Sequence, residues 1–298
     1  HAHQARDVVH RLSVSVVGEP DGRYRFAVGR SEETLELVWA GRTDVGYKRA
    51  INEDSLVTVP GVFAVADGLG GHSAGDRASA AVVRRLGDAA RRRDRRGGIL
   101  DDADTDRAIH RASGDIAAET AGVRYGSGTT VSGFAVIARE RRPVLAVFNI
   151  GDSRVYRYEA GRLTQLTVDH SLVQELVDAG RLRAEDAEAH PDSNVITRAV
   201  GFGGDLVPDR WILRPQAGVR LLACTDGLTK ELDRAEIAAI VGAGDDPAAT
   251  ADALVAAALA AGGRDNVTVV VADVLEAPGG GTILFDGTAT AEIPRSDS

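Results

Sequence analysis

The sequence is poor in cysteine, methionine and lysine. Its 298 residues include one cysteine, Cys224, no methionine, and lysine only at Lys48 and Lys230. A lone cysteine cannot form an internal disulfide bond, and it cannot supply the paired thiolates of a structural zinc site. We therefore expect a protein of a reducing compartment, with a cytoplasmic location. Because residue 1 is His and methionine is absent, we also expect the chain to be a piece of a longer protein.

Long apolar runs are also missing. The longest candidate, Ala253–Ala261, ends at Gly262 and Gly263, well short of the roughly 20 residues that span a bilayer. No charged segment followed by an apolar one opens the chain, so a secretory leader is not expected. The sequence therefore predicts no membrane segment.

The composition is that of an ordinary folded protein with an acidic balance. Apolar residues make up 44% and charged residues 27% of the chain, which excludes wholesale disorder. With 35 basic against 44 acidic residues the net charge is −9, which argues against a nucleic-acid partner, although a local basic patch would escape this sum. We expect a monomer that does not bind nucleic acid.

Short β-branched and apolar runs predict strands at 35–39, 62–66, 130–137, 144–150, 154–158, 219–224 and 267–274. Only brief links separate the runs 144–150, 154–158 and 162–166. Because such links cannot hold the crossover of a parallel pair, we predict an antiparallel three-stranded meander here. The sheets are expected to be antiparallel.

Apolar residues recur at steps of three and four in five segments, which predicts helices at 74–90, 105–121, 171–179, 234–241 and 247–261. These helices fall between blocks of strands and do not alternate with them one for one. The grouping favours an α+β protein with helices on antiparallel sheets over a doubly wound parallel sheet.

The two ends of the chain differ from the middle. We expect residues 1–40 to form an N-terminal extension in which 10–17 and 23–29 pair as a hairpin that leads into the first core strand. Residues 277–298 contain three consecutive glycines and mixed polar residues, and we expect them to be a flexible tail.

Five aspartates stand at predicted strand ends beside turn-forming residues: Asp54, Asp67, Asp152, Asp226 and Asp265. Any one of them could be an ordinary turn aspartate, but five repetitions indicate that several carboxylates meet at one sheet edge. Such a cluster is repulsive unless a cation neutralises it. Oxygen ligands without convergent His or Cys favour Mg²⁺ or Mn²⁺ over zinc. Two such ions could turn a bridging water into hydroxide and hold a phosphoryl oxygen.

Eight motifs in order carry a family resemblance: Thr43-Asp44-Val45-Gly46, Arg49, Asn52-Glu53-Asp54-Ser55, Asp67-Gly68-Leu69-Gly70-Gly71-His72, Gly128-Thr129-Thr130, Gly151-Asp152-Ser153-Arg154, Asp226-Gly227-Leu228 and Asp265-Asn266. The chain from about 41 to 274 resembles the bacterial branch of the metal-dependent PPM (type 2C) Ser/Thr protein phosphatases. The resemblance implies a four-layer α-β-β-α sandwich with a metal centre at one end. It also implies a catalytic domain at 41–276 with a flap at about 167–201.

The resemblance assigns metal-binding roles by position. It implies that Asp67 bridges two ions, that the Gly68 carbonyl is a ligand, and that Asp226 and Asp265 bind the first ion. Asp152, with Asp226, would hold a third and weaker ion. Asp54, or Glu53 beside it, would orient metal-bound water, and Asn266 could orient ligands from behind.

Two further residues receive catalytic roles from the same resemblance. Arg49 would grip the substrate phosphate, a task that suits the fixed two-pronged guanidinium. His72 would protonate the leaving alkoxide, or it is an ordinary hydrogen-bonded loop histidine. His170 and His190 lie at the ends of the flap, where we expect structural or substrate-contacting roles.

The resemblance implies hydrolysis of phosphoserine and phosphothreonine in proteins by a hydroxide that bridges two Mn²⁺ or Mg²⁺ ions, without a phosphoenzyme. The expected partners are phosphoproteins and Ser/Thr protein kinases. Two alternatives stay open: a catalytically silent module of the same fold that binds or senses, and an enzyme acting on small phosphorylated metabolites. A cysteine phosphatase is excluded because the sixth residue after Cys224 is Lys230, where that class requires arginine.

Overall fold

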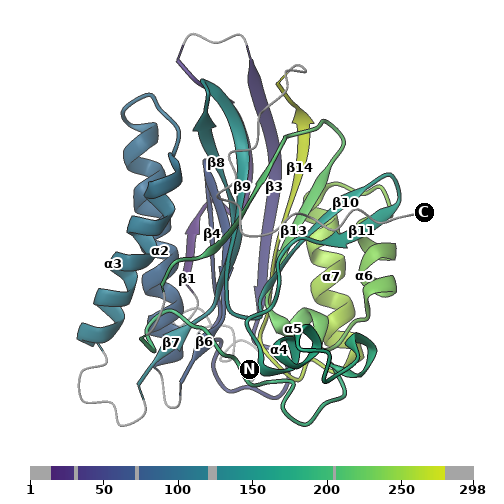
Figure 1. Ribbon diagram of the computed structural model, residues 1–298. Coiled ribbons are helices and arrows are strands. Elements are labelled where there is room, and N and C mark those ends of the chain that lie inside the picture. The colour runs from purple at the N-terminus through teal and green to yellow at the C-terminus, as the bar shows by residue number, and fades with distance from the viewer. Residues whose placement is uncertain (1–14, 30–32, 71–73, 120–125, 204–205, 279–298) are drawn as a thin grey trace, which may run out of the picture.

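Two six-stranded β-sheets stack face to face, and helices cover both outer faces (Figure 1). The computed structural model describes residues 15–29, 33–70, 74–119, 126–203 and 206–278. Helices α2 (Gly75–Asp94) and α3 (Asp102–Glu119) lie on one side, and α6 (Arg234–Val241) and α7 (Pro247–Ala261) lie on the other. The predicted α+β class and four-layer sandwich are confirmed. No helix within these ranges is long and apolar enough to cross a membrane.

The first sheet has the strand order β1-β4-β5-β8-β9-β12. Its strands are β1 (Ser15–Gly18), β4 (Ser55–Val59), β5 (Val62–Ala66), β8 (Val131–Arg139), β9 (Arg142–Ile150) and β12 (Asp209–Leu213). Alternate residues face opposite layers, so that Val57 packs toward α2 and α3 while Leu56 faces the other sheet. Both faces are buried, which explains why the central strands read as continuous apolar runs.

The second sheet has the order β11-β10-β13-β14-β3-β2. Its strands are β2 (Asp21–Ala27), β3 (Thr34–Asp44), β10 (Arg154–Glu159), β11 (Arg162–Gln165), β13 (Arg220–Cys224) and β14 (Val267–Glu276). Between the sheets, Phe63 stacks on Phe134 with ring centroids 5.2 Å apart, and Trp39 lies 4.9 Å from Phe63. This aromatic cluster holds the two sheets together at the centre of the sandwich.

The remaining elements are short and gather at the lower end of the molecule in Figure 1. They are the strand pair β6 (Gly68–Leu69) and β7 (Gly128–Thr129), helices α4 (Leu172–Asp178) and α5 (Asp226–Thr229), and the 3₁₀ turn η1 (Ala184–Asp186). All five predicted helices are present. The sequence did not predict α5, because a single helical turn is too short to show periodicity.

The predicted meander is wrong at its first link. β10 and β11 do pair antiparallel, but β9 belongs to the first sheet and β10 to the second. The link crosses between the sheets at Gly151, whose φ of 112° favours glycine, and a Cβ there would lie 2.6 Å from the Thr130 side chain. The crossing leaves Asp152 at the end of the sandwich.

The predicted N-terminal hairpin is also wrong. β1 pairs parallel with β4, and β2 pairs antiparallel with β3, so the two segments form edge strands of different sheets. The Glu19 carbonyl, in the link between them, accepts hydrogen bonds from Thr58 Oγ1 at 2.7 Å and Trp39 Nε1 at 3.2 Å, one residue from each sheet. β1–β4 is the exception to the antiparallel prediction. Residues 1–14 and most of the predicted tail, 279–298, lie outside the described residues.

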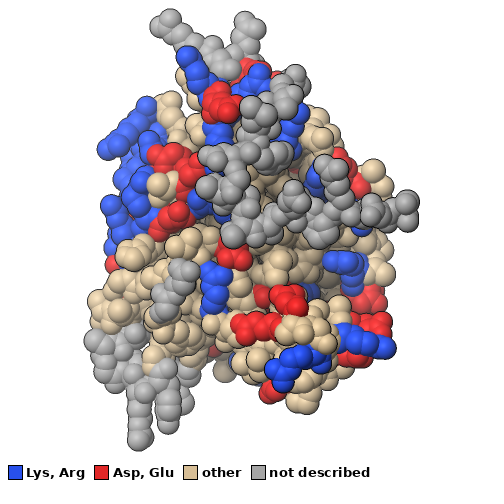
Figure 2. Space-filling view, viewed as in Figure 1, with Lys and Arg blue, Asp and Glu red and all other residues tan. Residues whose placement is uncertain are grey.

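A local basic patch does exist in this acidic chain. Figure 2 shows Lys and Arg gathered on the side formed by α2 and α3, where α2 ends in Arg91, Arg92 and Arg93. Part of this charge is neutralised locally, since Arg93 Nε lies 2.6 Å from Asp104. The patch lies on the helical layer, away from the sheet ends that carry the predicted aspartates.

Candidate metal centre

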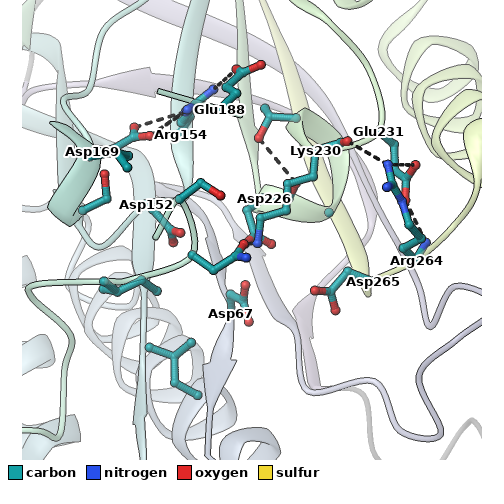
Figure 3. Close-up of a pocket in the computed structure, with 18 of the residues that line it drawn as sticks. Asp67, Asp152, Arg154, Asp169, Glu188, Asp226, Lys230, Glu231, Arg264 and Asp265 are labelled. Carbon is teal, nitrogen blue, oxygen red and sulfur yellow. Dashed lines mark hydrogen bonds and ion pairs between the residues drawn. The ribbon is translucent and has the colours of Figure 1, made fainter. Parts of the chain in front are cut away.

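The five predicted aspartates meet at one end of the sandwich. Asp54 immediately precedes β4, Asp67 follows β5, Asp152 links β9 to β10, Asp226 opens α5 after β13, and Asp265 lies just before β14. All except Asp54 line a pocket of about 760 Å³, together with Arg49, Glu53 and Gly68. Figure 3 shows Asp67, Asp152, Asp226 and Asp265 around the centre of this pocket. The topology therefore brings together side chains that are up to 211 residues apart in the chain, counting from Asp54 to Asp265.

The backbone of Asp67 is fixed by two threonines. Asp67 N donates to Thr130 Oγ1 at 2.9 Å, and the Asp67 carbonyl accepts from Thr129 Oγ1 at 2.8 Å and from Thr130 N at 2.9 Å. These bonds leave the carboxylate free to point into the pocket. The Gly-Thr-Thr segment thus positions the central carboxylate, a role that sequence reasoning did not assign to it.

Asp54 is only 1% exposed and does not line the pocket, although its neighbour Glu53 does. Its Oδ2 accepts hydrogen bonds from Thr268 Oγ1 at 2.7 Å and Thr225 Oγ1 at 2.9 Å, which fix the side chain in one orientation. Its Oδ1 has no hydrogen-bond partner. A carboxylate held in this way can orient a water or an ion above it with its second oxygen.

Burial and mutual repulsion disfavour the charged form of these carboxylates. Burial, reinforced by the charge of Asp226, raises the pKa of Asp152 to about 7 and the pKa of Asp67 well above its ordinary value. Burial likewise raises the pKa of Asp54 to about 7, against the two threonine hydrogen bonds that lower it. Oδ1 of Asp152 and Oδ1 of Asp226 are buried without hydrogen-bond partners. Unpaired carboxylate oxygens are the ligand chemistry that a hard divalent cation prefers, and such an ion would supply the missing charge and contacts. Within the described residues no three Asp, Glu, His or Cys side chains are close enough to hold one ion as they stand, so binding would draw the carboxylates together.

Glycines allow the backbone segments of the centre to approach each other closely. A Cβ at Gly68 would lie 2.2 Å from the Gly75 carbonyl oxygen, and Gly68 N donates to the Glu53 carbonyl at 3.2 Å. A Cβ at Gly227 would lie 1.8 Å from the Asn266 carbonyl oxygen. Side chains at these positions would separate the segments that carry Asp67, Asp226 and Asp265.

Asn266 holds the β3–β4 loop in place. Its Nδ2 donates to the carbonyls of Val45 at 2.9 Å and Ile51 at 3.0 Å, and its Oδ1 accepts from Glu53 N at 2.8 Å. Arg49 lies in the same loop. Asn266 therefore binds the main chain of this loop and contacts none of the predicted ligand side chains through these three bonds.

Two cationic side chains already lie against the aspartates. Arg49 is about half exposed, and its Nη2 donates to Asp265 Oδ2 at 2.8 Å. Lys230 forms an ion pair with Asp226, one turn earlier on α5. Sequence reasoning placed Arg49 here through the resemblance but missed Lys230, whose only signal was the i,i+4 spacing from Asp226.

Residues of the segment 167–201, which was predicted to be a flap, line part of the pocket. Its base is fastened by the bonds Leu172 N to Val195 O and Thr197 N to His170 O, both 2.9 Å. His170 Nδ1 accepts from Gly151 N at 3.0 Å, which ties the flap to the link that carries Asp152. His170 thus makes a structural contact here, and the expected choice between structural and substrate-contacting roles stays a prediction.

The sequence analysis also assigned a role to His72 and excluded one for Cys224. His72 lies outside the described residues, so its proton-donating role stays a prediction. Cys224 is fully buried in β13, and burial raises its pKa to about 12. A thiol in that state is a poor nucleophile, in agreement with the exclusion of a cysteine phosphatase.

Comparison with known proteins decides the family. The family model "Protein phosphatase 2C" matches residues 48–261. This chain belongs to the protein phosphatase 2C family. The resemblance predicted from the eight motifs is therefore confirmed.

Members of the protein phosphatase 2C family with curated names or solved structures cover most of this chain. Serine/threonine protein phosphatase PstP of Mycobacterium tuberculosis is 40% identical over 245 residues, which are 82% of this chain and 46% of PstP. The chain thus spans about half the length of that relative. Serine/threonine phosphatase stp of Listeria innocua is 36% identical, covering 78% of this chain and 94% of the relative.

The catalytic domain of PstP has been solved in complex with two manganese ions. That structure is 37% identical, with a TM-score of 0.72, and covers 81% of this chain and all of the solved domain. A second PstP structure gives 38% identity and a TM-score of 0.73, over 81% of this chain and 99% of that structure. Both similarities support the sandwich fold of this family member.

Proposed function

We propose that this protein hydrolyses phosphoserine and phosphothreonine in phosphoproteins, using two Mn²⁺ or Mg²⁺ ions and no phosphoenzyme. The observation that carries the proposal is the meeting of four aspartates in one pocket beside Arg49, two of them, Asp152 and Asp226, with a buried oxygen that has no hydrogen-bond partner. The manganese ions in the related PstP domain support the choice of metal.

The proposed ligands are Asp67, Gly68 through its carbonyl, Asp226 and Asp265, with Asp54 orienting water and Asp152 holding a weaker third ion. The bound cations would lower the pKa of water and neutralise charge on the phosphoryl oxygens. Arg49 would bind and orient the phosphate through its guanidinium. His72 would donate the proton that the leaving serine or threonine oxygen requires.

The test is phosphate release from matched phosphothreonine, phosphoserine and phosphotyrosine peptides, with and without Mn²⁺. We expect turnover of the first two peptides, loss of at least about 99% of it in excess EDTA, and full return after dialysis into Mn²⁺. Substantial activity in saturating EDTA would contradict the metal mechanism. No turnover under any condition would favour the silent binding module, and a preference for a sugar phosphate would favour a metabolite phosphatase.

Arg49→Ala should weaken phosphate binding more than it slows chemistry. Arg49 lies at the pocket rim and can offer two parallel N–H groups to a phosphate. We expect KM for a phosphothreonine peptide to rise about tenfold or more, with a smaller change in kcat. Steady-state kinetics at saturating Mn²⁺ measure both constants, with Arg49→Lys as the charge-matched control. An unchanged KM in the alanine variant would exclude the assigned role.

The domain limits, partners, location and assembly state are part of this proposal. The catalytic unit would extend beyond 41–276 toward the N-terminus, because β1 and β2 supply edge strands to both sheets. The partners would be phosphoproteins and the Ser/Thr protein kinases that make them. A monomer in the cytoplasm is the proposed state, and the single cysteine favours a reducing compartment.

A further inference from the structure

Lys230 is the one lysine that lines the pocket of the metal centre, in a chain with only two lysines. Its side chain is 39% exposed, whereas that of Asp226, its ion-pair partner, is only 12% exposed. The ammonium thus reaches from the surface onto a nearly buried carboxylate. Figure 3 shows Lys230 extending toward Asp226 among Asp67, Asp152 and Asp265.

The position of Lys230 is set by local helix geometry. Asp226 is the first residue of α5, and Lys230 is the cap residue one turn later, so the two side chains fall on the same side of the turn. Lys230 N also donates to the Asp226 carbonyl at 2.8 Å. The ion pair is therefore held by backbone as well as by charge.

The ammonium acts on more than one carboxylate. Asp152 and Asp265 line the same pocket as Lys230 and Asp226, and the positive charge of Lys230 opposes the rise that burial causes in the pKa of Asp152. Asp226 and Asp152 each keep one buried oxygen, Oδ1, without a hydrogen-bond partner. Lys230 thus compensates part of the negative charge at these two residues while leaving one oxygen of each available.

We propose that the Lys230 ammonium acts as a permanent monovalent cation within this metal centre. It neutralises part of the negative charge of Asp226 and Asp152 and so weakens the binding of a divalent ion to these two carboxylates. The inference rests on the proposed metal-dependent function and adds a regulator of metal number and affinity to it. Because a fixed ammonium and a divalent cation compete for the same carboxylates, the ion shared by these two aspartates is the one that Lys230 weakens.

The experiment measures binding of MnCl₂ to the metal-free full chain by isothermal titration calorimetry, for wild type, Lys230→Met and Lys230→Arg. We expect Lys230→Met to bind one additional Mn²⁺, or to bind its weakest Mn²⁺ about tenfold tighter. Lys230→Arg keeps the charge and should match wild type within about twofold. Lys48→Met is the control for loss of an exposed lysine, because Lys48 does not line the pocket, and it should also match wild type.

Thermal melting of the same proteins supplies a second readout that needs no turnover. In EDTA, Lys230→Met should have a lower melting temperature than wild type, because the carboxylates lose their internal cation. The increase in melting temperature on adding Mn²⁺ should be larger for Lys230→Met than for the other three proteins. Unchanged stoichiometry and affinity in Lys230→Met would overturn this inference alone, whatever its melting temperature in EDTA. A wild-type chain that binds no Mn²⁺ would overturn the proposed function as well.

Discussion

Asp67→Asn is expected to lower kcat for a phosphothreonine peptide by a factor of at least about 10³ while the fold stays intact. Asp67 is the carboxylate on which Asp54, Asp152, Asp226 and Asp265 all act electrostatically. Asparagine has almost the same size but lacks the charge that would hold two cations together. The backbone should not move, because Thr129 and Thr130 bind the main chain of Asp67 and not its side chain.

The measurement pairs steady-state kinetics in Mn²⁺ with thermal melting in EDTA. Removal of one buried charge from a repulsive cluster should leave the metal-free variant at least as stable as wild type. Asp115→Asn is the matched control, since Asp115 pairs with Arg85 on the helical layer at 2.6 Å and should keep normal activity. If Asp67→Asn retained more than about a tenth of wild-type kcat, the assignment of Asp67 as the central ligand would be wrong.

Gly227→Ala is expected to destabilise the protein by about 2 to 3 kcal/mol and to reduce activity at least about 100-fold. The new methyl group would lie 1.8 Å from the Asn266 carbonyl oxygen, and its next contacts are also backbone atoms of Asn266 and Val267. No side chain can rotate away to relieve this overlap. The turn that carries Asp226 must therefore separate from the residues just before β14, which include Asp265.

Gly114→Ala provides the comparison. Gly114 is an exposed position within α3 where an added Cβ meets nothing within 4 Å, so alanine should stabilise the helix by about 0.5 to 1 kcal/mol. Urea unfolding in EDTA gives both free energies of unfolding, and peptide kinetics in Mn²⁺ give the activities. Equal stability of Gly227→Ala and wild type would show that the α5–β14 junction is not closely packed.

The helices and the acidic cluster could be predicted because their signals are local. The segment 247–261 is rich in alanine and leucine, which are strong helix formers, and it lies between Asp246-Pro247 and Gly262. Each aspartate likewise sits beside its own turn residue. The family resemblance then supplied roles that spacing alone could not. Strand pairing was harder, because the three-residue link 151–153 can either turn back within one sheet or cross to the other sheet. The choice depends on packing of Gly151 against Thr130, which lies between β7 and β8.

The contributions of Lys230 and Asn266 could be read only from the folded molecule. In the sequence, Lys230 served only to exclude a cysteine phosphatase, yet it lines the pocket beside Asp226. Asn266 makes its three side-chain hydrogen bonds to main-chain atoms more than 200 residues away. Such long-range contacts leave no pattern in a single sequence.

The carboxylates of the centre belong to both sheets, and Asp152 lies in the link where the chain crosses from one sheet to the other. Asp54 and Asp67 adjoin strands of the first sheet, and Asp226 and Asp265 adjoin strands of the second. Ions bound among them would cross-link the two sheets at the end of the sandwich where the carboxylates lie. Separation of the sheets at that edge would then require the ions to leave, so metal occupancy and slow hydrogen exchange there should rise and fall together.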